Sequence, residues 1–338
     1  MKSQKSSIFV IPEKSNEMNN REIIIDLLGS DLGPEEMLEG SRAVLEAFPD
    51  ISLVLAGPQA LIEAANLPEG RYRILASEKT VTNLDNPIEA FYSKEPVSVF
   101  KALEEAGRCD DVLGVISAGN TGALFAGAIR FLLADKTVRP CIAAILPTTQ
   151  GGFTCLVDAG ASIDCGPAQL VEFAHQGSSF MRSLYKIDSP RVGLLSNGAE
   201  PTKGNKLVKE AHALLAKEEG INFVGNIEGN KTLSGLCDVL VCEGFAGNQV
   251  LKNSEGMAVN LITEIVKYGK MHNVPAAKEI VGYLMSRFDF ASLGAGIMLG
   301  TRKLVLKNRG SCKRDAVKNA AQIIVNIAEN KTLYESIH

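Results

Sequence analysis

The stretch DVLGVISAGNTGALFAGAIRFLL, residues 111–133, decides the fold of this chain. It begins with an apolar run over 112–116, typical of a buried strand, which breaks at a small, polar turn over 118–122. Small and apolar residues then recur at helical spacing up to Leu132. A strand, a glycine-rich turn and a helix start bring free backbone N–H groups and the positive end of a helix dipole to one point. The sequence therefore predicts either an anion site or a plain strand-to-helix connection at this turn.

Four other apolar strands end in similar turns, in which glycine stands beside Asp, Asn, Glu or Lys. These turns are GSD at 29–31, DAGASID at 158–164, NGAEPTKGN at 197–205 and EGFAGN at 243–248. Strands alternate with helical stretches along the chain, which predicts an α/β fold: a three-layer αβα sandwich with a mainly parallel sheet. The carboxyl ends of parallel strands share one edge, where ligands bind, so we expect the five turns to form one site.

The pattern predicts a polar lead-in over 1–20 and a single αβα domain over 21–338. Residues 250–288 are too long for one crossover and predict a projecting helical pair. The apolar stripe of this pair favours a dimer contact over a membrane contact. Its basic residues Lys267, Lys270 and Arg287 leave a role at a lipid surface open.

The composition argues against several classes of protein. The net charge of −4, from 35 basic and 39 acidic residues, argues against a general nucleic-acid binder. The seven cysteines contain no CxxC pair and mostly lie in apolar runs, which is typical of free thiols in a reducing cytoplasm. No apolar stretch is long enough to span a bilayer. The sequence therefore predicts a cytoplasmic protein.

Several catalytic devices are missing from the sequence. It has no G-x-S-x-G elbow, no Walker A sequence and no G-x-G-x-x-G fingerprint after the first strand. Its four histidines are poorly placed for a Ser-His-Asp or Cys-His device, so we expect no covalent enzyme intermediate. No spacing of acidic residues, histidines or cysteines selects for a metal, and we predict no metal site.

Seven segments resemble, in order, the bacterial phosphate acyltransferase family of fatty acid and phospholipid synthesis, PlsX. They are GSDLGPE (29–35), SAGNTGALFAGA (117–128), RPCIAAILPT (139–148), DAGASID (158–164), EPTKGN (200–205), NFVGNIEG (222–229) and VLVCEGFAGNQVLKNSEG (239–256). The resemblance covers about residues 22–325. It implies a fold similar to isocitrate and isopropylmalate dehydrogenases and to phosphotransacetylases.

The resemblance also implies an activity and partners. An acyl group on acyl carrier protein would pass to inorganic phosphate, giving acyl phosphate for phospholipid synthesis. The family implies a homodimer without an organic cofactor, in the cytoplasm and peripherally associated with the inner face of the cell membrane. Positioning of phosphate beside a thioester, with N–H donors for the oxyanion, fits such turns.

Our hypothesis places phosphate on the N–H groups of the 119–122 turn and on Lys203, with asparagines orienting the substrate and acidic residues ordering their surroundings. The predicted catalytic residues are Asn120, Asp164, Lys203 and Asn248. The predicted substrate-binding residues are Asp31, Gly119, Thr121, Gly122, Asp158, Gly204, Asn205, Glu243 and Gly247.

The chain departs from the family pattern, which marks a diverged member. Ser30 and Ser162 replace a glycine and an asparagine, and Glu243 replaces an aspartate. The family histidine near the C-terminus is absent, with Arg309 at or next to its place. Two alternatives therefore stay open. One is a phosphotransacetylase-like enzyme that uses short acyl groups, and the other is a catalytically silent paralogue that binds the carrier protein.

Overall fold

The computed structural model describes residues 21–82, 84–93, 95–288 and 295–329, and the predicted lead-in over 1–20 lies outside these residues. The chain divides into two units, one of Met1–Pro140 with Ala295–His338 and one of Cys141–Gly294. The chain thus leaves the first unit after Pro140 and returns to it at Ala295. The single domain over 21–338 stays a prediction, because a division into units does not test it.

The first unit is built on a sheet with the strand order β3-β2-β1-β4-β11-β10. Its strands are β1 (Arg21–Asp26), β2 (Ile51–Gly57), β3 (Tyr72–Ala76), β4 (Val112–Ser117), β10 (Gly296–Leu299) and β11 (Leu304–Lys307). β1 lies between β2 and β4 and is parallel to both, and β4 is also parallel to β11. Only the β10–β11 pair of this order is antiparallel among the described strands. The strands β1, β4 and β11 therefore end at one edge.

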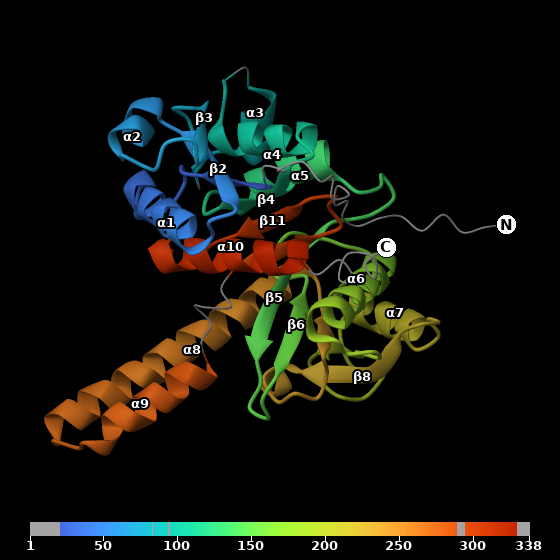
Figure 1. Ribbon diagram of the computed structural model, residues 1–338. Helices are drawn as coiled ribbons and strands as arrows, with labels where there is room; N and C mark the ends of the chain where they lie inside the picture. The colour runs from blue at the N-terminus through green and yellow to red at the C-terminus, as the bar shows by residue number, and fades with distance from the viewer. Residues whose placement is uncertain (1–20, 83, 94, 289–294, 330–338) are drawn as a thin grey trace. The chain divides into compact units, whose positions relative to one another are not determined.

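Helices cover both faces of this sheet (Figure 1). Helices α4 (Ser98–Arg108) and α5 (Thr121–Leu132) lie on one face, and α1 (Pro34–Ala47) and α10 (Arg314–Glu329) lie on the other. Two short helices, α2 (Gln59–Ala64) and α3 (Pro87–Tyr92), complete the described helices of this unit. Ile24, Val54 and Val115 belong to the core that packs against α4 and α5. Because both faces are buried, the strands are almost entirely apolar and do not alternate.

The second unit has the strand order β5-β6-β9-β7-β8. Its strands are β5 (Cys141–Pro147), β6 (Phe153–Val157), β7 (Arg191–Ser196), β8 (Asn222–Glu228) and β9 (Val239–Val241). β5 and β6 form an antiparallel pair. The neighbours along β6-β9-β7-β8 are all parallel, so β6, β7 and β9 end at a common edge.

Two helices of the second unit pack closely against its strands from opposite faces. In α6 (Pro167–Tyr185), a Cβ on Gly177 would lie 2.7 Å from Val239 Cγ1, so the helix approaches the sheet where a side chain would clash. On the other face, the early turns of α8 (Gly244–Met271) pack with Ala246 and Val250 against the apolar core. Helix α7 (Lys206–Leu215) contacts α6, and a short 3-10 helix, η1 (Gly229–Lys231), follows β8.

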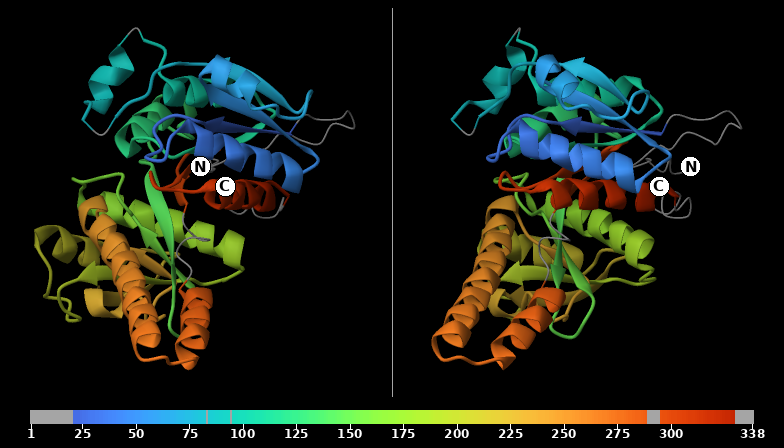
Figure 2. Two further views of the ribbon diagram at one scale, coloured as in Figure 1. Left: turned by 90° about the vertical axis from the view of Figure 1, so that its left-hand side faces the viewer. Right: turned by 60° about the vertical axis from the view of Figure 1, so that its left-hand side comes forward.

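The predicted helical pair is present. Helix α8 is followed by α9 (Ala276–Arg287), and the two helices run side by side (Figures 1 and 2). Figure 1 shows the pair extending away from the strands of its own unit. Leu261 and Met285 on this pair are 57% and 56% exposed. Among the described residues, no helix is long and apolar enough to span a membrane. The dimer contact and the membrane contact of this pair stay predictions.

Candidate functional site

Three turns of the first unit meet where β1, β4 and β11 end. A Cβ on Gly29 would lie 2.5 Å from the Cα of Gly119, which brings the first two turns into direct contact. The third turn follows β11, and its Gly310 carbonyl accepts hydrogen bonds from the Asp31 N–H at 2.8 Å and from Ser30 Oγ at 3.1 Å. The structure therefore brings Asp31 and the 119–122 turn to one edge, together with residues 308–311.

The first turn of α5 has backbone donors to spare. The side chain of Asn120 caps this helix, since its Oδ1 accepts from the Ala123 N–H at 3.0 Å and its Nδ2 donates to the Thr82 carbonyl at 3.1 Å. Neither the Thr121 N–H nor the Gly122 N–H has an acceptor among the described residues. Two open donors at the positive end of a helix form an anion site.

Gly119 contributes less than the sequence predicts. Its N–H donates to Ser117 Oγ at 3.1 Å, so this donor is already used inside the protein. Ser117 Oγ in turn donates to Asp26 Oδ2 at 2.7 Å. Burial raises the pKa of the Asp26 carboxyl to about 6, which leaves it mainly ionised at pH 7. Asp26 and Ser117 therefore hold the 119–122 turn in place through Gly119 and are not available to a ligand.

Lys307, the last residue of β11, lies behind the same turn. Its Nζ donates to the carbonyl of Ala118 at 3.2 Å and to the carbonyl of Asn308. Burial lowers the pKa of this ammonium to about 8, so it still carries most of its charge at pH 7. The sequence analysis did not select Lys307 or Asp26. A charged residue directly after a short apolar strand, as in 23–26 and 304–307, is the signal that could have identified both.

In the second unit, the hydrogen-bonding capacity of Asp158 is used inside the protein, mostly by its own loop. Its carboxylate is fully buried and accepts hydrogen bonds from the N–H groups of Ile142, Gly160, Ala161 and Ser162 at 2.5 to 3.2 Å. Burial raises the pKa of this carboxyl, while these four donors oppose the rise. The position and bonding of Asp158 indicate that it orders the 158–162 loop.

The start of α8 packs against this loop and has no open donor. The Gly244 N–H donates to the Ser162 carbonyl at 2.7 Å. The Glu243 carboxylate accepts from the N–H groups of Phe245 at 2.5 Å and Ala246 at 3.0 Å. A carboxylate cap on a fully bonded first turn disfavours a second anion. Glu243 thus orders the helix start and does not prepare a phosphate site there.

Two other predicted residues lie near this junction. A Cβ on Gly247 would overlap the Asp158 carbonyl oxygen at 1.9 Å, so only glycine allows this close approach. The half-buried side chain of Asn248 lies against Gly160, whose ideal Cβ would be 3.4 Å from Asn248 Cβ. Asp164 is exposed at the end of the loop.

A pocket of about 350 Å³ lies at the start of α7. The Gly204 N–H donates to Asn197 Oδ1 at 2.8 Å, and Asn205 caps the helix by accepting from the Val208 N–H at 2.9 Å. Among the described residues, no acceptor takes the N–H of Lys206 or Leu207. The first turn of α7 therefore resembles that of α5 in having two open donors at a helix N-terminus.

The same pocket collects predicted residues from two turns of the second unit. Gly204, Asn205 and Glu243 line it, together with Ser196, whose buried Oγ has no hydrogen-bond partner among the described residues. The predicted Lys203 lies in the preceding loop with an exposed side chain. Each unit thus offers one capped helix start with two open N–H groups, and the roles of the predicted residues toward a substrate stay predictions.

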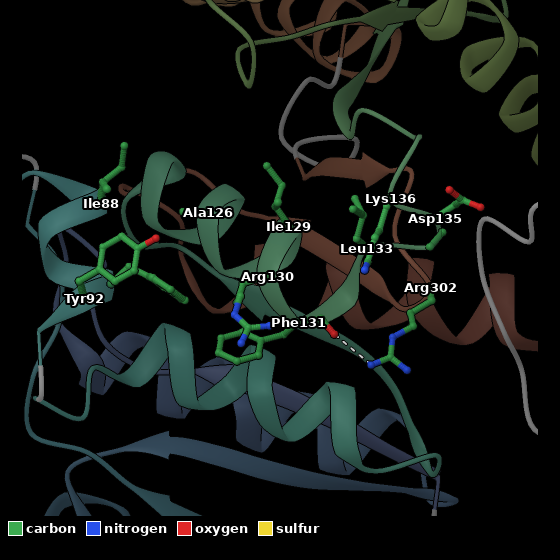
Figure 3. A pocket seen from close by; sticks show the side chains of 12 residues that line it. Ile88, Tyr92, Ala126, Ile129, Arg130, Phe131, Leu133, Asp135, Lys136 and Arg302 are labelled. Carbon is green, nitrogen blue, oxygen red and sulfur yellow. Dashed lines mark hydrogen bonds between the residues drawn. The ribbon is translucent and has the colours of Figure 1, made fainter.

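A further hollow in the first unit lies away from the α5 start. It has a volume of about 880 Å³ and lies between α3 and the second half of α5 (Figure 3). Ile88, Tyr92 and Ile129 line it beside Arg130, and Arg302 donates to the Phe131 carbonyl at 3.0 Å. None of the predicted site residues lines this hollow.

The chain matches a family model described as fatty acid synthesis protein over residues 21–333. It is 37% identical over 318 residues to a phosphate acyltransferase of Thermoanaerobacter pseudethanolicus, which covers 92% of this chain and 95% of that protein. It is 36% identical over 327 residues to a phosphate acyltransferase of Clostridium acetobutylicum, covering 92% and 96% of the two chains.

Solved structures with a similar fold include two phosphotransacetylases. The one from Streptococcus pyogenes has a TM-score of 0.56 at 14% identity and covers 93% of this chain and 96% of its own. The EutD phosphotransacetylase from Staphylococcus aureus has a TM-score of 0.54 at 16% identity, covering 92% and 94%. At these identities the similarity concerns the fold alone, and it confirms the predicted α/β class.

Proposed function

Since the chain belongs to the phosphate acyltransferase family, and is thus an acyltransferase of fatty acid and phospholipid synthesis, we propose that it transfers an acyl group from acyl carrier protein to inorganic phosphate. A phosphate oxygen attacks the carbonyl carbon of the thioester, the C–S bond breaks, and the carrier leaves as a thiolate that takes up a proton. The product is an acyl phosphate for phospholipid synthesis.

The observation that carries the proposal is the start of α5. Phosphate accepts hydrogen bonds from the open N–H groups of Thr121 and Gly122, while the charge of Lys307 behind the turn favours an anion. Phosphate is already a nucleophile, so holding it in place beside the thioester supplies much of the rate enhancement. No side chain needs to become a covalent intermediate.

The second unit supplies residues for the acyl donor in this proposal. The open donors at the start of α7, with Asn205, stabilise the oxyanion that develops on the thioester carbonyl, while Lys203 keeps its proposed role toward phosphate. Asn248 orients the substrate, while Asp158 and Glu243 hold the loops that carry it. Asp31 and Asp164 keep their proposed roles in ordering the surroundings of the substrate.

A direct test is phosphate-dependent cleavage of an acyl carrier protein thioester, followed by release of the carrier thiol. We expect kcat/KM to fall at least about 10-fold in a variant with both Lys203→Ala and Asn120→Ala, because the bond of Lys203 to the charged substrate is lost and the cap that fixes the open N–H groups of α5 is removed. Removal of the Asn120 cap also costs about 1 kcal/mol of stability, so circular dichroism must confirm folding. Lys209→Ala, an exposed lysine on α7, is the control.

Full activity of the double variant would refute this placement of the substrates. A wild-type protein that binds the carrier but forms no acyl phosphate would refute the reaction and support a silent paralogue. Preference for acetyl over long-chain donors would support the phosphotransacetylase-like alternative.

We further propose that the protein forms a homodimer, and that it binds the inner face of the cell membrane without spanning it. We propose the α8–α9 pair as the element that makes the dimer contact or the membrane contact. The exposed apolar side chains of the pair support this proposal. Light scattering measures the dimer and flotation with anionic vesicles measures membrane binding. A monomer that stays with the unbound fraction would exclude both.

A further inference from the structure

A second cavity in the second unit lies between α8, α9 and the segment that follows β8. It has a volume of about 330 Å³, which is within the range of small-molecule sites. Its apolar lining includes Leu233, Met257, Leu261, Leu284 and Phe288. The rest of the lining consists of amide, hydroxyl, alanine, isoleucine and glycine residues, and none of the lining residues is charged. The part of a ligand that this cavity takes up should therefore be uncharged and largely apolar.

The cavity lies on the same helix as the pocket at the start of α7. Ala246, in the first turn of α8, lines that pocket, and Asn253 lines the cavity. Seven residues are almost two full turns, so Ala246 and Asn253 lie on one face of α8, about 10 Å apart along its axis. The two hollows thus follow one another along one side of a single helix.

We propose that this cavity binds the apolar tail of the acyl substrate, while the thioester end lies at the pocket bordered by the first turn of α8. This inference rests on the proposed function and adds to it the place where the acyl tail binds. The hydrophobic effect drives such binding, because each methylene that leaves water favours the complex.

The hollow of the first unit fits such a tail less well. Arg130, Asp135, Lys136 and Arg302 line that hollow, so charged groups surround its apolar side chains (Figure 3). An acyl tail placed there would displace water from these charges without replacing its hydrogen bonds. The absence of charge in the lining of the second cavity is what distinguishes the two.

The first test compares acetyl, octanoyl and palmitoyl donors. In the wild type, kcat/KM rises by about fourfold for each methylene that the cavity buries. The variant Ala258→Phe fills the cavity from α8, and the ratio of palmitoyl to acetyl kcat/KM falls at least tenfold. Val224→Phe adds the same side chain at an exposed position on β8 that does not line the cavity, and it leaves the ratio unchanged.

A second variant guards against a folding defect of the first. Leu261→Ala removes an apolar side chain that is 57% exposed, and it lowers the palmitoyl to acetyl ratio by about fourfold or more. Binding of the fluorescent fatty acid cis-parinaric acid provides a readout that needs no turnover. Its affinity falls at least tenfold in Ala258→Phe and stays constant in Val224→Phe.

Equal kcat/KM for all three donors in the wild type, or an unchanged ratio and unchanged probe affinity in folded Ala258→Phe, would overturn the assignment of the cavity. A wild type that forms no acyl phosphate from any donor overturns the proposed function instead. In that case the probe measurement alone decides whether the cavity binds an acyl tail.

Discussion

Replacing Thr121 by proline removes one of the two open donors at the start of α5 and little else. Thr121 is the first residue of the helix, where its N–H has no intrahelical acceptor. Proline fits this position without loss of a helical hydrogen bond. The preceding residue, Asn120, has ψ of 124°, which is the extended conformation that a following proline requires.

The size of the effect follows from the bond that is lost. A hydrogen bond to a charged group contributes about 1.5 to 3 kcal/mol, so the KM for phosphate should rise about 10- to 150-fold. Proline also restricts the unfolded chain, which adds about 0.4 to 1 kcal/mol to the free energy of unfolding. The variant should therefore be as stable as the wild type or slightly more stable, while its use of phosphate is impaired.

The assay is the initial rate of carrier thiol release against phosphate concentration, at saturating acyl donor. Thr121→Ala keeps the backbone N–H and removes only the side chain, so it is the matched control and should keep the phosphate KM. A folded Thr121→Pro protein with an unchanged KM for phosphate would refute the placement of phosphate at α5. An equal rise in both variants would assign the effect to the threonine hydroxyl.

Three further predictions concern the buried charges. Burial raises the pKa of Asp26 from its ordinary value of 3.8 to about 6 in the folded protein, so its contribution to stability is present at low pH and is lost as the pH rises through 6. Urea unfolding should therefore show a loss of about 1 kcal/mol between pH 5 and pH 7, and Asp26→Asn should abolish this loss. The Lys307 ammonium, with a pKa of about 8, loses its charge above that pH. The KM for phosphate should therefore rise above pH 8 in the wild type. In a pH profile of KM, the variant Lys307→Met should lack this rise. Asp158→Asn places an amide N–H₂ donor against the backbone N–H donors of the 158–162 loop. Urea unfolding should show a free energy of unfolding that is lower by about 2 to 4 kcal/mol. A change within about 0.5 kcal/mol, as is usual at surface positions, would contradict the role of Asp158 in ordering this loop.

The sequence predicts the fold well where apolar strands alternate with long helices along the chain. The 111–133 stretch forms β4 and α5, and the β5–β6 pair and the two long helices after 243 are also present. The four-residue strand β10 was missed, because so short a segment has no usable periodicity. Its position depends on pairing with β11, which local sequence does not reveal.

The site was predictable in position more than in role. Asn120, Asn205 and Glu243 all lie at helix starts, as their turns predict, but each uses its side chain to cap a helix. The same residue types serve as caps and as ligand contacts, so sequence alone does not separate the two. Which N–H groups stay open depends on distant partners, such as the Ser162 carbonyl that takes the Gly244 N–H.

The contact between Gly247 and the Asp158 carbonyl has a mechanical consequence. Helix α8 has 28 residues and is about 42 Å long, and it is seated on the end of β6 at its fourth residue. Any side chain at Gly247 would clash with the Asp158 carbonyl and push the helix away from β6. A tilt of only about 5° there would displace the far end at Met271 by about 3 Å, given the rise of 1.5 Å per residue over the 24 residues from Gly247. The direction in which the helical pair points therefore depends on Gly247, because its lack of a side chain lets α8 contact the end of β6.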